Sequence, residues 1–220
     1  MSTHASPLNL SHQHGFADLA PSTLGRLVDL AHALSRWAVW GAGGLILASV
    51  LLVTLDVLLR KLMGRGVGGA DELSGYAFAI GTSWSLAFAT LQRAHVRVDV
   101  LYHRLPRRAA AVLDWLSLVA TGVFCAYLSY YAFEVLTQSW TQGAHANSSL
   151  GTPLWVPQGL WLLGLGWMCV VLGLLLLRAS AALIRGDAGT VAAIAGVRSA
   201  QEEAREGAED GARIVQGEQS

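Results

Sequence analysis

The sequence predicts an all-α integral membrane protein with four transmembrane helices and short interfacial amphipathic helices. Of its 220 residues, 53% are hydrophobic and only 14% are charged, which is far from the composition of soluble domains. Four mainly apolar stretches also reach the roughly 20 residues needed to cross ~30 Å of hydrocarbon. They are about residues 37–59, 73–91, 109–133 and 156–177. Because lipid cannot satisfy backbone polar groups, each stretch is expected to be helical.

Three regions follow from this pattern. Residues 1–36 are predicted to be a cytoplasmic segment, and its apolar positions from Leu24 to Leu34 recur at helical spacing, which indicates a short helix on the membrane surface. Residues 37–180 form the predicted four-helix transmembrane domain. Residues 181–220 are predicted to be a disordered cytoplasmic tail, because residues 186–220 hold seven Asp/Glu against three Lys/Arg.

The basic residues predict that both termini are cytoplasmic. An even number of spans places the termini on one side, and cytoplasmic loops carry an excess of Lys and Arg. That side would hold Arg26, Arg36, the five arginines of residues 92–108, Arg178 and Arg185. The other side would hold only Arg60, Lys61 and Arg65.

No catalytic, metal or cofactor site is predicted. All seven histidines lie outside the apolar stretches, which argues against haem held between spans. Cys125 and Cys169 lie inside such stretches, where cysteine usually acts as a small hydrophobic residue, and no CxxC spacing is present. Motifs of serine, cysteine or zinc hydrolases are also missing, so the chain is not expected to be an enzyme.

The segment "QRAHVRVDVLYHRLPRR", residues 92–108, is predicted to connect the second and third spans along the cytoplasmic surface. If it is helical, His95, Asp99 and His103 share one face, but the two histidines would be about 12 Å apart along the axis, too far for one metal ion. An apolar stripe lies opposite them, which is typical of an interfacial helix. Binding of nucleic acid is a poor alternative, because these basic residues sit within reach of lipid headgroups.

Charged residues near the other membrane surface suggest local pairs. Asp56 and Arg60 are four residues apart on one helix face, which predicts an ion pair. Arg60 could instead pair with Glu72 across the first loop, or the two could be solvated separately. The middle of the four spans carries no ionisable residue, whereas a transporter that works alone usually does.

Two stripes of small residues could let helices pack closely. The second span places Gly75, Ala79, Ser83 and Ala87 four residues apart. The fourth span places Gly159, Gly166, Gly173 and Ser180 seven residues apart. Each stripe could pack inside this chain or dock another membrane protein, and the sequence leaves both alternatives open.

The order of these features resembles the small membrane subunit, or Q-type small permease, of tripartite ATP-independent periplasmic (TRAP) transporters. The resemblance covers about residues 37–180. It rests on Arg60 closing the first span, "DEL" at 71–73, "AHVRVDVL" at 94–101 followed by "LP", and "PLWVPQGLW" at 153–161. One departure is that family members often have a glycine and an acidic residue where this chain has Arg93 and Ala94.

The resemblance implies a partner role in a bacterial inner membrane. The small subunit docks on a large multi-span permease that carries the substrate and sodium sites, and a periplasmic binding protein delivers the substrate, commonly an organic acid. On this reading His95, Arg97 and Asp99 serve subunit assembly, as do Arg60, Glu72 and the two stripes. The alternative is a membrane-anchored regulatory or assembly protein without a transport role.

Overall fold

The computed structural model describes residues 23–93, 105–196, 208 and 211, and among them the regular structure is entirely helical apart from one isolated bridge between His145 and Pro153. The predicted all-α class is therefore confirmed. The helices are α1 (Thr23–Met63), α2 (Ala70–Leu91), α3 (Arg107–Thr141), α4 (Trp155–Ile184) and α5 (Ala188–Ala195).

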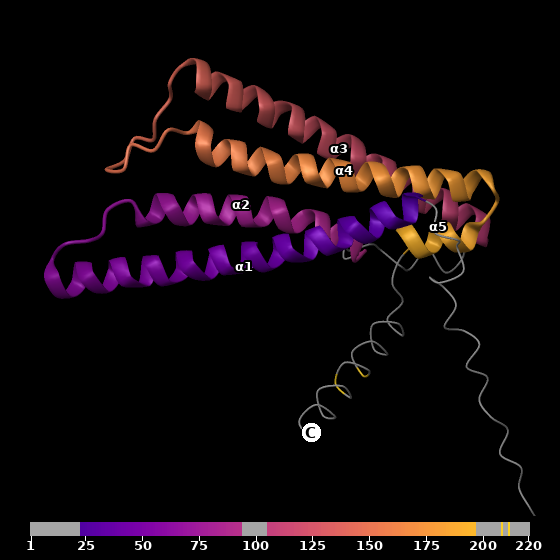
Figure 1. The fold of residues 1–220 in the computed structure, drawn as a ribbon, viewed down its shortest axis with the longest axis horizontal. Helices are drawn as coiled ribbons and strands as arrows, with labels where there is room; N and C mark the ends of the chain where they lie inside the picture. The colour runs from indigo at the N-terminus through magenta and orange to yellow at the C-terminus, as the bar shows by residue number, and fades with distance from the viewer. Residues whose placement is uncertain (1–22, 94–104, 197–207, 209–210, 212–220) are drawn as a thin grey trace, which may run out of the picture.

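The long helices form two antiparallel hairpins that lie side by side (Figure 1). One hairpin is α1 with α2, the other is α3 with α4, and they are joined mainly through the contact between α2 and α4. The loops of both hairpins lie at the same end of the molecule, and α5 lies at the opposite end, against α3 and α4 (Figure 1).

Three of the described helices are long and apolar enough to cross a membrane: α1 from Gly25 onward, α3 and α4. At 1.5 Å per residue the 22 residues of α2 also reach about 33 Å, but this helix is less apolar because it contains five Ser or Thr residues and two carboxylates. Four of the hydroxyls donate to carbonyls one turn earlier, which satisfies them within the helix: Ser74, Ser83, Ser85 and Thr90. Helix α2 thus has sufficient length to cross a membrane without the hydropathy of the other three, and the count of four spans stays a prediction.

The first helix differs from its prediction. The surface helix expected before residue 37 is continuous with the first span, since α1 runs unbroken for 41 residues. No proline interrupts it, and its N-terminal half is held by packing: Val28, Ala31 and Ser35 are buried. The indole N–H of Trp167 in α4 donates to the Ser35 hydroxyl at 3.0 Å. These contacts align residues 23–36 with the bundle, so they do not form a separate helix.

Ordered structure also extends beyond the predicted boundary at residue 180. The fourth helix ends at Ile184, and α5 follows after a short turn. Asp187 caps α5 by accepting from the backbone N–H of Thr190 at 3.0 Å, as expected of an N-cap carboxylate. Val191 and Ala195 are buried against the bundle. The sequence "AGTVAAIA" is apolar enough to pack against the bundle.

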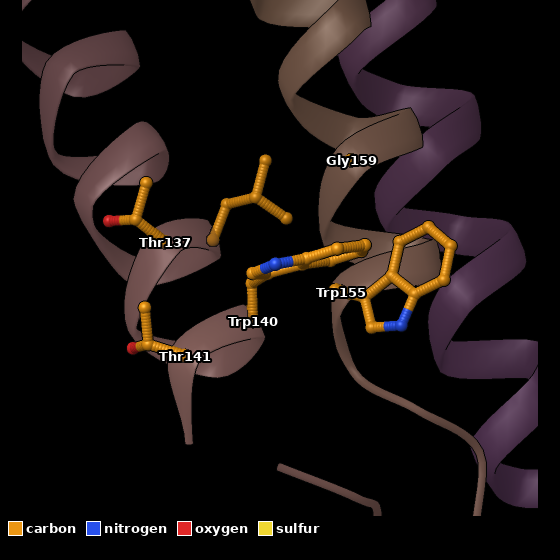
Figure 2. Close-up of a pocket in the computed structure, with 6 residues that line it drawn as sticks. Thr137, Trp140, Thr141, Trp155 and Gly159 are labelled. Carbon is orange, nitrogen blue, oxygen red and sulfur yellow. The ribbon is translucent and has the colours of Figure 1, made fainter. Parts of the chain in front are cut away.

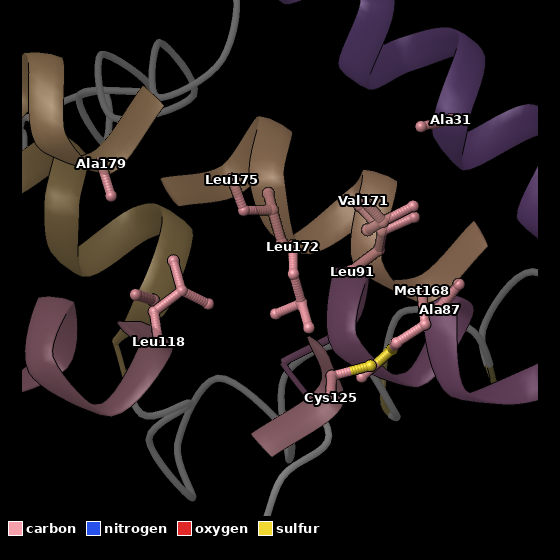
Figure 3. Close-up of a cluster of buried hydrophobic side chains, with 11 residues drawn as sticks. Ala31, Ala87, Leu91, Leu118, Cys125, Met168, Val171, Leu172, Leu175 and Ala179 are labelled. Carbon is pink, nitrogen blue, oxygen red and sulfur yellow. The ribbon is translucent and has the colours of Figure 1, made fainter. Parts of the chain in front are cut away.

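The core lies where α2, α3 and α4 meet, and Figure 3 shows its side chains. Val171, Leu172 and Leu175 of α4 form its centre, with Ala87 of α2 and Leu118 of α3 packed around them. Two further indole groups bridge helices. Trp84 of α2 donates to the Leu160 carbonyl at 3.1 Å, and Trp115 of α3 donates to the Ser180 hydroxyl at 2.8 Å. Burial and directional bonds together fix the rotation of α4.

Candidate functional site

The turn after α1 is anchored on a buried carboxylate. Asp56 is 3% exposed, and its Oδ2 accepts from Arg60 Nη2 at 2.6 Å, so the predicted ion pair is present. Its Oδ1 accepts from the backbone N–H of Val67, also at 2.6 Å. Gly66 passes so close that a Cβ there would lie 2.6 Å from Asp56 Oδ1. We call this arrangement the Asp56 latch; it folds the α1–α2 loop back over the end of α1.

Glu72 has different partners from those considered in the sequence. Its carboxylate accepts hydrogen bonds from the hydroxyls of Ser148 and of Tyr76, the latter at 2.7 Å. Arg60 is engaged with Asp56 instead, so a pair between Arg60 and Glu72 is not formed. The Ser148 hydroxyl, and then the Tyr76 hydroxyl, hold the pKa of Glu72 below its ordinary value by stabilising the charged form.

Glu72 therefore joins the two hairpins at their loop end. Ser148 belongs to the α3–α4 loop, and its neighbours pack on the turn before α2: Leu150 lies against Gly69, and Ser149 lies against Gly68. Both glycines have positive φ angles, 79° and 71°, and a side chain at Gly69 would overlap Leu150. Glycine is thus required at 69 both for the conformation and for the close approach.

The Glu72 contact predicts a pH dependence. Because the folded state lowers the pKa of Glu72, its contribution to stability is present above the unfolded pKa and is lost as the pH falls through the folded pKa. We expect Ser148→Ala to lower the unfolding temperature at about pH 7, and the difference from wild type to shrink towards about pH 3, across the usual carboxyl range. Thermal unfolding in detergent over this pH range measures the difference in unfolding temperature between the variant and wild type. Ser149→Ala, which leaves Glu72 untouched, is the control, and a pH-independent difference would contradict the assignment.

The stripe of small residues on α2 is exposed in its first half and buried in its second. Gly75 and Ala79 are exposed, and a Cβ at Gly75 would meet nothing within 4 Å. Ser83 is buried between α2 and α4. The internal part of this stripe is used for packing within the chain, and its first half is left open.

The stripe of small residues on α4 is open at its three glycines. A Cβ added at Gly159, Gly166 or Gly173 would meet no atom within 4 Å. The glycine that α4 does pack internally is Gly164, where a Cβ would lie 2.4 Å from Ser83 Oγ and 3.0 Å from the Ser83 backbone carbon. Sequence reasoning missed Gly164 because it lies outside the seven-residue repeat.

The connector between α2 and α3 is described only at its ends. His95, Arg97 and Asp99 lie outside the described residues. Just before them, Arg93 has a φ of 55°, the left-handed conformation that glycine favours, which fits the glycine often found here in the similar family. The Arg93 guanidinium donates to the Ala192 carbonyl of α5 at 3.3 Å. The connector therefore begins against α5.

The two cysteines meet between α3 and α4. Cys125 and Cys169 are free thiols with sulfurs 3.5 Å apart, and the Ser129 hydroxyl lies 3.3 Å from the Cys169 sulfur. In the part of the chain that the structure describes, no group of three His, Cys, Asp or Glu residues is placed to hold a metal ion. The two cysteines and Ser129 therefore serve as packing contacts between α3 and α4.

Comparison with known protein families gives a match that covers most of the helical bundle. The family model described as "Tripartite ATP-independent periplasmic transporters, DctQ component" matches residues 49–182. This range begins inside α1 and ends at the last turn of α4, so it contains the Asp56 latch, Glu72 and both small stripes. Searches of curated proteins and of solved structures found no match.

Proposed function

This chain belongs to the DctQ component family of TRAP transporters and is thus a small permease subunit in a membrane, and we propose that it scaffolds the large permease subunit during uptake. In this proposal the large subunit carries the substrate and sodium sites, and a periplasmic binding protein delivers an organic acid. The chain itself binds neither substrate nor ion. It works by presenting a fixed surface to its partner.

The observation that carries this proposal is the division of the small residues into packed and open faces. Gly164 and Ser83 are used inside the bundle, whereas Gly166 and Gly173 face open space. In lipid, smooth helix faces of this kind are where other helices approach closely. The carboxylates near the span ends support the same view, since Asp56 and Glu72 are engaged with groups of this chain.

We further propose that α1, α2, α3 and α4 all cross the bacterial inner membrane, with both termini cytoplasmic. Support comes from the common position of the two hairpin loops at one end of the molecule (Figure 1). The described residues at the opposite end include Arg93, Arg107 and Arg185. Basic residues at that end support a cytoplasmic location for it, because cytoplasmic loops carry an excess of Lys and Arg.

Co-purification tests the scaffold proposal. The chain, expressed with a large TRAP permease subunit of the same source, is expected to isolate with that subunit in mild detergent. Replacing His95, Arg97 and Asp99 together by alanine should weaken the recovered complex without unfolding the chain. Failure of the wild-type chain to isolate with the large subunit would overturn the proposal, and normal recovery of the triple variant would overturn the role given to the connector.

A truncation separates scaffolding from regulation by the tail. Removing residues 197–220 leaves α5 and its contacts with Arg93 in place. A scaffold lacking only these residues should still support transport, whereas loss of transport with intact complex formation would favour the regulatory alternative.

A further inference from the structure

An open groove lies between the ends of α3 and α4 nearest their connecting loop. It has a volume of about 340 Å³ and is lined by Leu136, Thr137, Trp140, Thr141, Trp155 and Gly159. We call it the α3–α4 groove. Figure 2 shows the Trp140 side chain lying across the space between the two helices, towards Trp155. The two rings meet edge to face, with centroids 4.9 Å apart and planes at 75°.

The wall of this groove is almost entirely apolar. Its two threonines use their hydroxyls on their own helix: Thr137 donates to the Glu134 carbonyl at 2.7 Å, and Thr141 donates to the Gln138 carbonyl at 3.1 Å. A water molecule in a cavity needs about two to four polar partners, and these walls do not supply them. An empty groove would lose dispersion contacts on both sides. The chemistry of the wall therefore selects hydrocarbon.

The volume of the groove distinguishes between an acyl chain and a protein segment as its occupant. A transmembrane helix is about 10 Å across with its side chains, too wide for a space of about 340 Å³ between two helices. An extended protein segment would leave its backbone groups without hydrogen-bond partners against an apolar wall. A single acyl chain has neither problem, since it is narrow, flexible and free of polar groups.

The position of the groove fits a lipid at the edge of the bilayer. Trp140 lies in the last turn of α3 and Trp155 is the first residue of α4, so the groove is at the end of two candidate spans whichever way the chain is inserted. Both side chains are exposed, 62% and 41%, and within the described part of the chain neither indole N–H has an acceptor. Indole groups at this depth bind the polar region of lipids.

We propose that the α3–α4 groove binds one membrane phospholipid, with an acyl chain against Trp140 and Gly159 and the headgroup region accepting from the indole N–H groups. The bound acyl chain fills the space where α3 and α4 diverge. It thereby holds the ends of the two helices at a fixed separation. This site is a property of the isolated chain, so it is independent of the scaffold role proposed above.

Photo-crosslinking tests the site. The full chain is placed in nanodiscs of phosphatidylcholine that contain a phosphatidylcholine with a diazirine in one acyl chain, and labelled peptides are identified by mass spectrometry. We expect labelling to concentrate on the peptides that contain Trp140 and Trp155. Gly159→Leu should abolish this labelling, because a Cβ at 159 meets no atom within 4 Å and the side chain can occupy the groove.

Gly166→Leu is the matched control. It makes the same change at an equally open position of the same helix, two turns away and outside the groove lining, and should keep the wild-type labelling. As a measurement that does not depend on a variant folding, native mass spectrometry of the wild-type chain after mild delipidation should retain one phospholipid.

Two outcomes would overturn the proposal. Equal labelling of wild type and folded Gly159→Leu would show only the surrounding bulk lipid. Retention of no phospholipid by the wild-type chain would show that no specific site exists.

Discussion

Replacing Gly164 by leucine is expected to separate α2 from α4. Even a single methyl group at this position would lie 2.4 Å from Ser83 Oγ and 3.0 Å from the Ser83 backbone carbon. A rotamer change of Ser83 relieves the first contact but not the second, so the helices must move apart. Because α2 and α4 form the main junction of the two hairpins, we expect a loss of about 3 kcal/mol in stability, at the upper end of the usual overpacking cost.

A thiol-reactive dye can follow this unfolding. The chain has two cysteines, both free, and Cys125 is buried, so the dye reacts with it as the bundle opens. Gly166→Leu is the control, because it adds the same side chain where a Cβ meets nothing within 4 Å. Equal unfolding temperatures for the two leucine variants would show that α2 and α4 do not approach at Gly164 as described.

A smaller substitution shows whether Ser83 is the obstacle. Gly164→Ala alone should destabilise the chain. Combined with Ser83→Gly, which removes the hydroxyl and the Cβ that lie nearest to the added methyl, it should destabilise less than the sum of the two single changes. Such a non-additive result is expected for residues in contact and not for distant, independent sites.

The sequence predicted small-residue helix packing but not the faces that pack. Gly159, Gly166 and Gly173 repeat every seven residues and therefore share a side of α4, yet that side is open. Which side of a helix meets its neighbour depends on the rotation of both helices, and this is set by tertiary contacts such as the bond from Trp84 to the Leu160 carbonyl. No local pattern around Gly164 contains that information.

Helix boundaries also depend partly on sequence pattern and partly on tertiary contacts. The all-helical class follows from composition and span length, and the family resemblance is confirmed by the match over residues 49–182. The break expected at residue 36 rested on a change from amphipathic to apolar character, which alters the surroundings of a helix without interrupting its backbone. Continuity of α1 instead depends on the burial of Val28 and Ala31 and on the bond between Trp167 and Ser35. That bond joins residues 132 positions apart.

The loop end of α1 combines a predictable interaction with an unpredictable one. Spacing alone predicted the pair of Asp56 with Arg60, and the distance of 2.6 Å agrees. The bond from the Val67 N–H to the same carboxylate could not be anticipated. It requires the chain to reverse after Met63, through Gly64 and past Gly66, where the lack of a side chain allows the approach.

Asp56→Ala is expected to release the α1–α2 loop and to cost about 2 kcal/mol, in the range for hydrogen bonds to a charged group. Most of this loss should come from Val67, because the Arg60 side chain is 64% exposed and water screens its pair with Asp56. Hydrogen exchange should show faster exchange at the Val67 amide, with a lower unfolding temperature. Asp71→Ala, which removes an exposed carboxylate from the first turn of α2, should change stability by less than about 1 kcal/mol.

Gly66 provides the sharper test of the latch. A methyl group there would lie 2.6 Å from Asp56 Oδ1, so Gly66→Ala should destabilise the wild-type chain and accelerate exchange at Val67. In the Asp56→Ala background that oxygen is gone, and the same substitution should cost much less. If Gly66→Ala costs as much without Asp56 as with it, the two residues are not coupled, and the loop is held by something other than this carboxylate.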